Sequence, residues 1–146
     1  MSQEQIRDIL TQYKTVAVVG ASRDSSKDSN RVAAYLMNHG FTMIPVNPTA
    51  DAILGQKCYK SLMDMPPAVQ KRVEIVDVFR PSQDTPPIVE QAVKLKRQHG
   101  RPYVVWMQLG IANEQAAETA RQAGITVIMD KCMMQEHSKL FAHVQN

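Results

Sequence analysis

The chain is poor in the residues that mark disulfide-rich, zinc-binding and nucleic-acid-binding proteins. It has two cysteines, Cys58 and Cys132, which lie far apart and outside any C-x-x-C or histidine-paired spacing. Neither a disulfide framework nor a zinc site is therefore indicated. Aromatic residues make up 5% of the sequence, and the formal net charge of +3 is spread along the chain. Nucleic-acid binding is not expected, because it requires a basic surface interleaved with aromatics.

Long hydrophobic runs are also missing. No apolar stretch has the length that crosses a bilayer, and residues Met1–Gln5 lack the basic region and apolar stretch of a secretion signal. We therefore expect a cytoplasmic protein without a membrane partner. With 146 residues, 44% of them hydrophobic, the chain can bury one sizeable core, so we expect a single domain over residues 1–146.

Five apolar runs rich in β-branched residues alternate with helical patterns, which predicts an α/β fold with a parallel sheet covered on both faces. The runs are Thr15–Gly20, Thr42–Val46, Glu74–Phe79, Pro102–Met107 and Ile125–Met129. Helices are expected from near Asn30 to Gly40, from after Pro86-Pro87 to Gly100, from Asn113 to Gly124, and over Glu4–Tyr13 and Met133–Val144. The segment between the second and third runs is expected to hold a short edge strand, Lys57–Tyr59, and an irregular helix, Ser61–Lys71, interrupted by Pro66-Pro67.

The first run stops at a glycine and leads to a helix start, as parallel α/β folds do where they bind a phosphate. The usual G-x-G-x-x-G fingerprint is incomplete, because Ser22 and Ser25 stand at its second and third glycine positions. The Gly20–Ala21–Ser22 turn is followed by a long polar loop. Its side chains can replace missing backbone contacts to a phosphate: hydroxyl and amide groups of Ser25, Ser26, Ser29 and Asn30, and cations of Arg23, Lys27 and Arg31.

The second run ends Val46-Asn47-Pro48, without the acidic residue that holds the ribose hydroxyls of NAD. A carboxylate there would repel the 3′-phosphate of coenzyme A, so the neutral Asn47 with basic residues nearby favours that cofactor. NADP stays open by the same logic. Two further runs end at the same edge. At the end of the third, Arg80 can pair with a phosphate and Phe79 can flank a ring or the pantetheine arm. After the fourth, Gln108 can hydrogen-bond an amide.

Several segments, in order, resemble those of small stand-alone CoA-binding proteins, which are similar to the CoA-binding Rossmann domain of the succinyl-CoA synthetase α subunit. They are Val16–Ser22, Pro45–Pro48, Ile53–Gly55, Val76–Arg80, Val105–Gly110 and Met129–Cys132. The resemblance implies a doubly wound Rossmann-like sheet with strand order 3-2-1-4-5-6. It also implies a CoA site in which Gly20–Ser22 and Ser29–Arg31 lie near the phosphates, and Val46–Pro48 with Phe79-Arg80 lie beside the adenosine.

No G-x-S-x-G, HExxH or P-loop motif occurs, and no carboxylate pair has a spacing suited to acid–base catalysis. We therefore expect a protein that binds CoA or an acyl-CoA without catalytic machinery of its own. Cys132, after the last run, stays a candidate for a mixed disulfide with the CoA thiol. The alternatives are an NADP-dependent oxidoreductase and a ligand-free interaction domain, which could form a homodimer through its tail.

Overall fold

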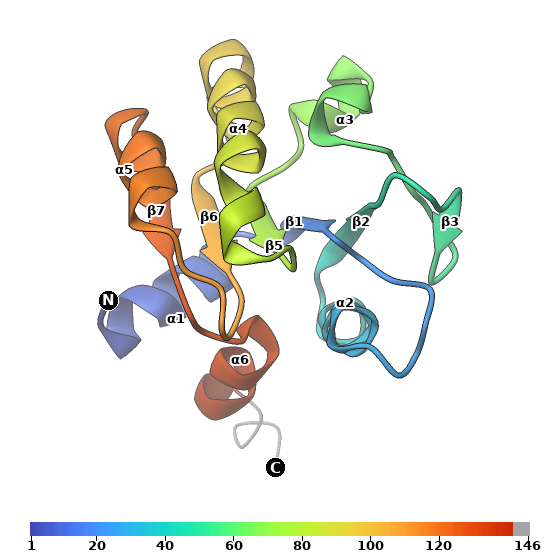
Figure 1. Ribbon diagram of the computed structural model, residues 1–146. Helices are drawn as coiled ribbons and strands as arrows, with labels where there is room; N and C mark the ends of the chain where they lie inside the picture. Colours follow the sequence, from blue (N-terminus) through green and yellow to red (C-terminus); the bar gives the residue numbers. More distant parts are fainter. Residues whose placement is uncertain (142–146) are drawn as a thin grey trace.

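A computed structural model describes residues 1–141 and shows a parallel sheet with helices on both faces (Figure 1). The strand order is β2-β1-β5-β6-β7, and every neighbouring pair is parallel. These strands are β1 (Thr15–Val19), β2 (Thr42–Val46), β5 (Ile75–Val78), β6 (Val104–Met107) and β7 (Thr126–Ile128). The predicted α/β class, with a Rossmann-like doubly wound parallel sheet, is confirmed.

The helices form two layers with the sheet between them (Figure 1). On one face lie α1 (Gln3–Gln12), α2 (Asp28–Asn38) and α6 (Met133–Phe141); on the other lie α3 (Pro67–Gln70), α4 (Thr85–His99) and α5 (Glu114–Gln122). Because side chains alternate between the faces of a strand, one strand supplies both cores. In β1, for example, Val16 and Val18 enter the first core, whereas Ala17 and Val19 enter the second.

Local sequence signals explain where two of these helices begin. Ser2 caps α1 in a capping box with Gln5, in which each side chain bonds the other residue's backbone. Asn113 caps α5 by accepting a hydrogen bond from the backbone of Ala116. Three alanines of α5 are buried, so this helix lies close to the sheet: Ala116, Ala117 and Ala120.

The predicted strand order needs one correction, at the edge of the sheet where strand 3 was expected. The expected edge strand Lys57–Tyr59 is reduced to a single parallel bridge between Val46 and Tyr59. The preceding residues pair elsewhere, because β4 (Gln56–Lys57) forms a small antiparallel hairpin with β3 (Ala52–Ile53). Just beyond Tyr59, Ser61 begins the short 3₁₀ helix η1 (Leu62–Asp64). The extended segment is too short for a ladder, so the order is 2-1-4-5-6 with a bridge where strand 3 was expected.

Three helix predictions also change. The helix expected near Asn30 begins at Asp28, which places Ser29 and Asn30 inside its first turn. The irregular helix Ser61–Lys71 is split into η1 and α3 because Pro66 and Pro67 start a new turn between them. The helix expected after Pro86-Pro87 begins earlier, because α4 starts at Thr85, directly after a short 3₁₀ turn, η2 (Ser82–Asp84). The end of the predicted tail helix, including Val144, lies outside the described residues.

Candidate functional site

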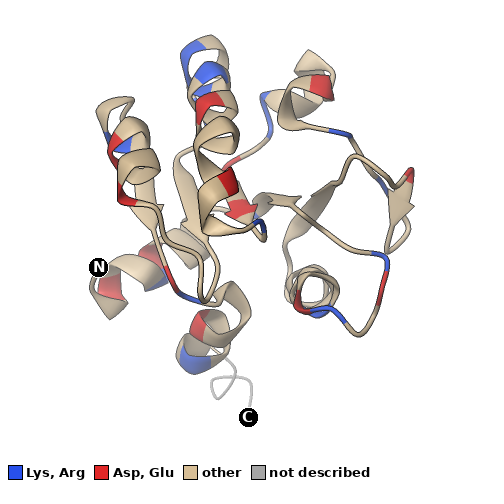
Figure 2. Cartoon of the chain, in the orientation of Figure 1, with Lys and Arg blue, Asp and Glu red and all other residues tan. Residues whose placement is uncertain are grey.

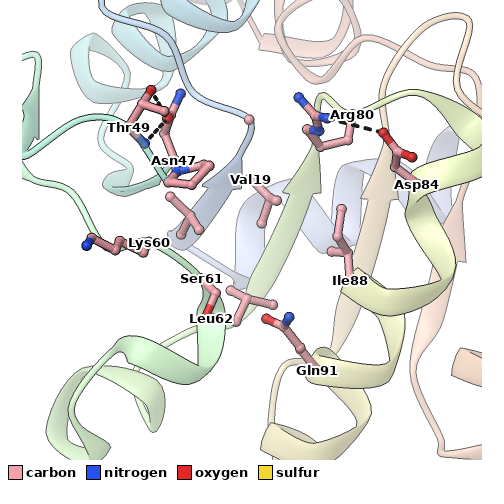
Figure 3. Close-up of a pocket in the computed structure, with 13 residues that line it drawn as sticks. Val19, Asn47, Thr49, Lys60, Ser61, Leu62, Arg80, Asp84, Ile88 and Gln91 are labelled. Carbon is pink, nitrogen blue, oxygen red and sulfur yellow. Dashed lines mark hydrogen bonds and ion pairs between the residues drawn. The ribbon is translucent and has the colours of Figure 1, made fainter.

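The carboxyl ends of β1, β2 and β5 border a pocket of about 420 Å³, called here the Asn47 pocket (Figure 3). Ligands of open parallel sheets bind at this edge, where the chain order reverses between neighbouring strands. The reversal occurs here between β1 and β5. Apolar side chains form its walls and polar groups its rim. The lining residues are Val19, Gly20, Val46, Asn47, Pro48, Thr49, Lys60, Ser61, Leu62, Arg80, Asp84, Ile88 and Gln91.

Gly20 sits where β1 and β5 come closest at this edge. Its φ of +89° suits glycine, and a Cβ atom on it would lie 3.0 Å from the carbonyl oxygen of Phe79. Its backbone N–H donates a 2.9 Å hydrogen bond to the carbonyl of Val46 on β2. The glycine therefore allows three strand ends to meet without a side chain between them, and leaves backbone exposed at the pocket.

Asn47, at the end of β2, is held by three hydrogen bonds. Its Nδ2 donates to the carbonyl of Ala21 at 2.7 Å, and its Oδ1 accepts from the backbone N–H and the hydroxyl of Thr49 at 2.7 and 2.8 Å. Figure 3 shows the Thr49 bonds at the pocket rim. Asn47 therefore fixes the loop after β1 against the end of β2, and it does so without a charge.

The loop after Gly20 is ordered by its own polar side chains. Ser22 accepts a hydrogen bond from the backbone of Asp24, and Asn30 donates one to the carbonyl of Ser22 at 2.8 Å. Arg31 pairs with Asp28 and donates to the carbonyl of Ser26. These contacts hold the beginning of α2 against the Gly20–Ser22 turn.

The predicted residues of this loop therefore divide into two groups. Ala21, Ser29 and Asn30 are buried, and they shape the loop. Arg23 and Arg31 are exposed, outside the residues that line the Asn47 pocket. A ligand would have to lie at the start of α2 to contact their charged groups.

Cations and one acid meet at the rim of the Asn47 pocket. Arg80 lies 3.2 Å from Asp84, in an ion pair that leaves both side chains about half exposed (Figure 3). Lys60 is the second cation of the rim, and the sequence analysis missed it. The bridge between Val46 and Tyr59 brings Lys60 to the end of β2. Elsewhere in residues 1–141, basic and acidic residues are interspersed along the helices and loops (Figure 2).

A second, smaller pocket of about 130 Å³ lies between β5, β6, α2 and the start of α6; we call it the Gln108 pocket. Its lining includes two predicted residues, Phe79 and Gln108, together with Cys132. Phe79 thus faces away from Arg80, which borders the Asn47 pocket. The resemblance implied that Phe79 and Arg80 lie together beside the adenosine, but residues adjacent along an extended chain point to opposite faces.

Beneath the Gln108 pocket lies a buried acid that the sequence analysis did not single out. Asp77, in the centre of β5, is fully buried, and Gln108 donates a 2.6 Å hydrogen bond to its Oδ1. Burial raises the pKa of Asp77 to about 7, although the Gln108 bond acts in the opposite direction. The sequence did contain a signal, an acid at the centre of the apolar run Ile75–Val78.

Cys132 precedes α6 and is buried at the wall of the same pocket. Burial raises the pKa of its thiol, against the opposing effect of the backbone N–H groups of Gln135 and Met134. The carboxyl groups of Asp77 and Asp28 also raise this pKa. A thiol in such surroundings stays protonated near neutral pH, so its position favours packing over nucleophilic attack.

Residues 1–141 also bear on two other types of site. No group of three or more His, Cys, Asp or Glu side chains is placed to hold a metal ion within this part of the chain. No helix among the same residues is both long and apolar enough to cross a membrane.

The geometry described so far defines a Rossmann-like α/β protein with pockets at the switch point of its sheet. Comparison with known proteins identifies the family. Residues 14–138 match the family model of the CoA binding domain, and the chain belongs to that family. The resemblance inferred from the sequence segments is thereby confirmed.

Relatives of similar length support this assignment. The chain is 35% identical to the uncharacterized protein YneT of Bacillus subtilis over 137 residues, which cover 94% of this chain and 95% of YneT. A hypothetical protein from Pyrococcus horikoshii OT3 has a solved structure with 41% identity and a TM-score of 0.87, covering 96% of this chain and 92% of that one.

Larger enzymes match over part of their length. Acetate–CoA ligase [ADP-forming] II of Archaeoglobus fulgidus is 44% identical over 62 residues, which are 41% of this chain and 9% of the ligase. The acetyl-coenzyme A synthetase 1 of Ca. Korarchaeum cryptofilum matches in structure with a TM-score of 0.64 and 25% identity, over 78% of this chain and 25% of the synthetase. The chain is thus related to the CoA-binding domains of such ligases.

Proposed function

We propose that the chain binds coenzyme A at the carboxyl edge of its sheet, with the 3′-phosphoadenosine end in the Asn47 pocket. The observation that carries this proposal is the neutral end of β2, where the Nδ2 of Asn47 donates to Ala21 and its Oδ1 accepts from Thr49. No carboxylate is presented there to bind a free ribose diol or to repel a ribose phosphate.

The walls and rim of the Asn47 pocket support the same assignment. Val46, Leu62 and Ile88 provide apolar surface for an adenine ring. Lys60 and Arg80 supply positive charge for the 3′-phosphate. A phosphate would compete with Asp84 for Arg80, because the two side chains are already paired. We therefore expect Lys60 to contribute more to phosphate recognition than Arg80.

The diphosphate is assigned to the Gly20–Ser22 turn and the start of α2. This helix has no side-chain cap at its N-terminus. The backbone N–H of Asn30 donates to the carbonyl of Lys27, which leaves the backbone N–H groups of Asp28 and Ser29 for an anion. Four residues that the sequence predicted to contact phosphates surround that helix start: Arg23, Ser29, Asn30 and Arg31.

We assign binding rather than catalysis to this site. The ionic groups of the Asn47 pocket are Lys60, Arg80 and Asp84, of which the last two form an ion pair. The hydroxyl of Ser61 is engaged with Asp64 at the start of η1. These groups suit the holding of an anionic ligand. Free CoA and an acyl-CoA share every contact proposed so far.

Calorimetric titration with CoA, dephospho-CoA, NADP and NAD tests the assignment. CoA is expected to bind more tightly than dephospho-CoA, which lacks the 3′-phosphate. The K60A variant should lose about three-fold in CoA affinity, as removal of a partly exposed ion pair does, and little in dephospho-CoA affinity. Lys94, exposed on α4 and outside the pocket lining, provides the matched control K94A.

Each alternative predicts a different binding pattern. Binding of NADP without CoA would favour the oxidoreductase. Binding of none of the four ligands would favour the interaction domain. Equal affinity for CoA and dephospho-CoA would overturn the placement of the 3′-phosphate beside Lys60. A cytoplasmic location and a homodimer stay predictions of the sequence analysis.

A further inference from the structure

The carboxyl group of Asp77 is unusual in where it lies and in how little it contacts. It is fully buried in a sheet, with Val18 of β1 and Trp106 of β6 as its partners in register. Its Oδ2 has no hydrogen-bond partner among the described residues. Burial of a carboxyl group with one oxygen unpaired is costly, and buried polar groups normally find partners. Packing alone gives no reason for an acid at this position.

Gln108 connects this buried acid to the Gln108 pocket. It lines the pocket, while its Nε2 donates to Asp77 beneath. Its Oε1 forms no hydrogen bond with the residues that the structure describes, so the free acceptor of this amide is available on the pocket side. The remaining walls are largely apolar, including Val32, Phe79 and Ile111. Gln108 is the one buried amide of the lining, since the other polar side chains, Asp28 and Gln135, are exposed.

The amide can present either of two groups, depending on the proton of Asp77. When Asp77 is ionised it accepts from Nε2, and Gln108 offers an oxygen to the pocket. When Asp77 is protonated its hydroxyl can donate to Oε1 after rotation of the amide, and Gln108 then offers an N–H donor. Protonation of Asp77 thus changes the group that Gln108 presents to the pocket from a hydrogen-bond acceptor to a donor.

We propose that the Gln108 pocket receives the sulfur end of bound coenzyme A and that the Asp77–Gln108 pair distinguishes the free thiol from an acyl thioester. The inference rests on the proposed function, since it assumes that CoA spans the Gly20–Phe79 contact between the two pockets. That contact borders both, because Gly20 lines the Asn47 pocket and Phe79 lines the Gln108 pocket.

The chemistry of the two ligands makes the discrimination possible. A thiol has an S–H donor, which the Oε1 of Gln108 accepts when Asp77 is ionised. A thioester has lost that donor and carries a carbonyl acceptor instead, which needs the N–H group offered when Asp77 is protonated. Above the pKa of Asp77, which is about 7, free CoA is favoured; below it, acyl-CoA gains.

Other ionisable groups border the same space and must be separated from Asp77. Asp28 at the start of α2 and Cys132 before α6 line the pocket, and Lys131 precedes Cys132. His137 lies further along α6 and is buried. The phosphates of the ligand also titrate, but they are common to CoA and acetyl-CoA and cancel in the ratio of the two affinities.

The experiment measures the dissociation constants of CoA and acetyl-CoA from pH 5.5 to pH 8, under reducing conditions, for the wild-type protein and the D77N variant. The ratio of the acetyl-CoA constant to the CoA constant should rise about five-fold across this range in the wild type, the amount one hydrogen bond contributes. In D77N the ratio should be independent of pH, because an amide at position 77 does not titrate.

The Q108M variant provides a second test if D77N folds poorly. It keeps Asp77 and similar side-chain volume but removes the amide, so the ratio should again be independent of pH. A constant ratio in the wild type would overturn the inference while leaving CoA binding intact. A pH dependence that persists in D77N would also overturn it, by assigning the effect to Asp28, Cys132 or His137. Failure of wild-type protein to bind CoA at any pH would instead overturn the proposed function.

Discussion

Replacement of Asp77 by asparagine is predicted to stabilise the protein, and the gain should depend on pH. Burial raises the pKa of Asp77 from 3.8 to about 7, a shift of about three units, which corresponds to about 4 kcal/mol at roughly 1.4 kcal/mol per unit. The folded state holds a proton on Asp77 that the unfolded state releases between these two values. The protonated carboxyl's contribution to stability is therefore complete below pH 3.8 and is lost as the pH rises to about 7.

Urea denaturation of the wild type and D77N at pH 5, 6, 7 and 8 measures this effect. The free energy of unfolding of D77N minus that of the wild type should grow by about 1.4 kcal/mol for each pH unit from pH 5 to 7, and then level off. Other groups titrate equally in both proteins and cancel. A difference that stays constant from pH 5 to 8 would show that Asp77 keeps an ordinary pKa, and would refute the reasoning about its burial.

Three further predictions concern stability. G20A should cost about 2 kcal/mol or more, through its positive φ and its contact with Phe79, whereas G110A, with φ +82° and open space around it, should cost about 1 kcal/mol; equal losses in urea denaturation would deny the close approach. N113A should cost about 1 kcal/mol, since it removes the cap of α5; unchanged thermal stability would contradict this. Burial lowers the pKa of His137 from 6.5, so its contribution is complete above pH 6.5 and lost as the pH falls. H137Q should reduce this acid-side loss in urea titrations between pH 5 and 7.

The strands and most helix ends could be read from the sequence because the signals are local. Alternation of apolar runs with helical patterns gave the strands of the sheet within a residue or two, and Asn113 marked the start of α5. The third strand failed for the opposite reason. Whether Lys57–Tyr59 pairs with β2 or with β3 depends on competition between two partners, and the hairpin took Gln56 and Lys57.

The candidate site was predictable where its residues follow a strand. Gly20 ends a predicted run, and Asn47, Arg80 and Gln108 each directly follow one. The structure places all four at the carboxyl edge of the sheet. Lys60 directly follows the expected edge strand Lys57–Tyr59 but was missed because it belongs to no recognisable motif; the bridge between Val46 and Tyr59 brings it to the rim. Asn47 was expected to leave a neutral surface, but the structure shows in addition that it secures the loop after β1.

The sequence by itself determined the class of fold, the position of the turn at Gly20 and the neutral end of β2, since each depends on residues adjacent in the chain. Only the tertiary structure decided that Phe79 and Arg80 border different pockets and that Gln108 joins a buried Asp77 to the ligand edge. These relations arise between separate strands and helices. The pKa of Asp77 is raised by the surrounding core, and that environment exists only after the sheet and its two helical layers have packed.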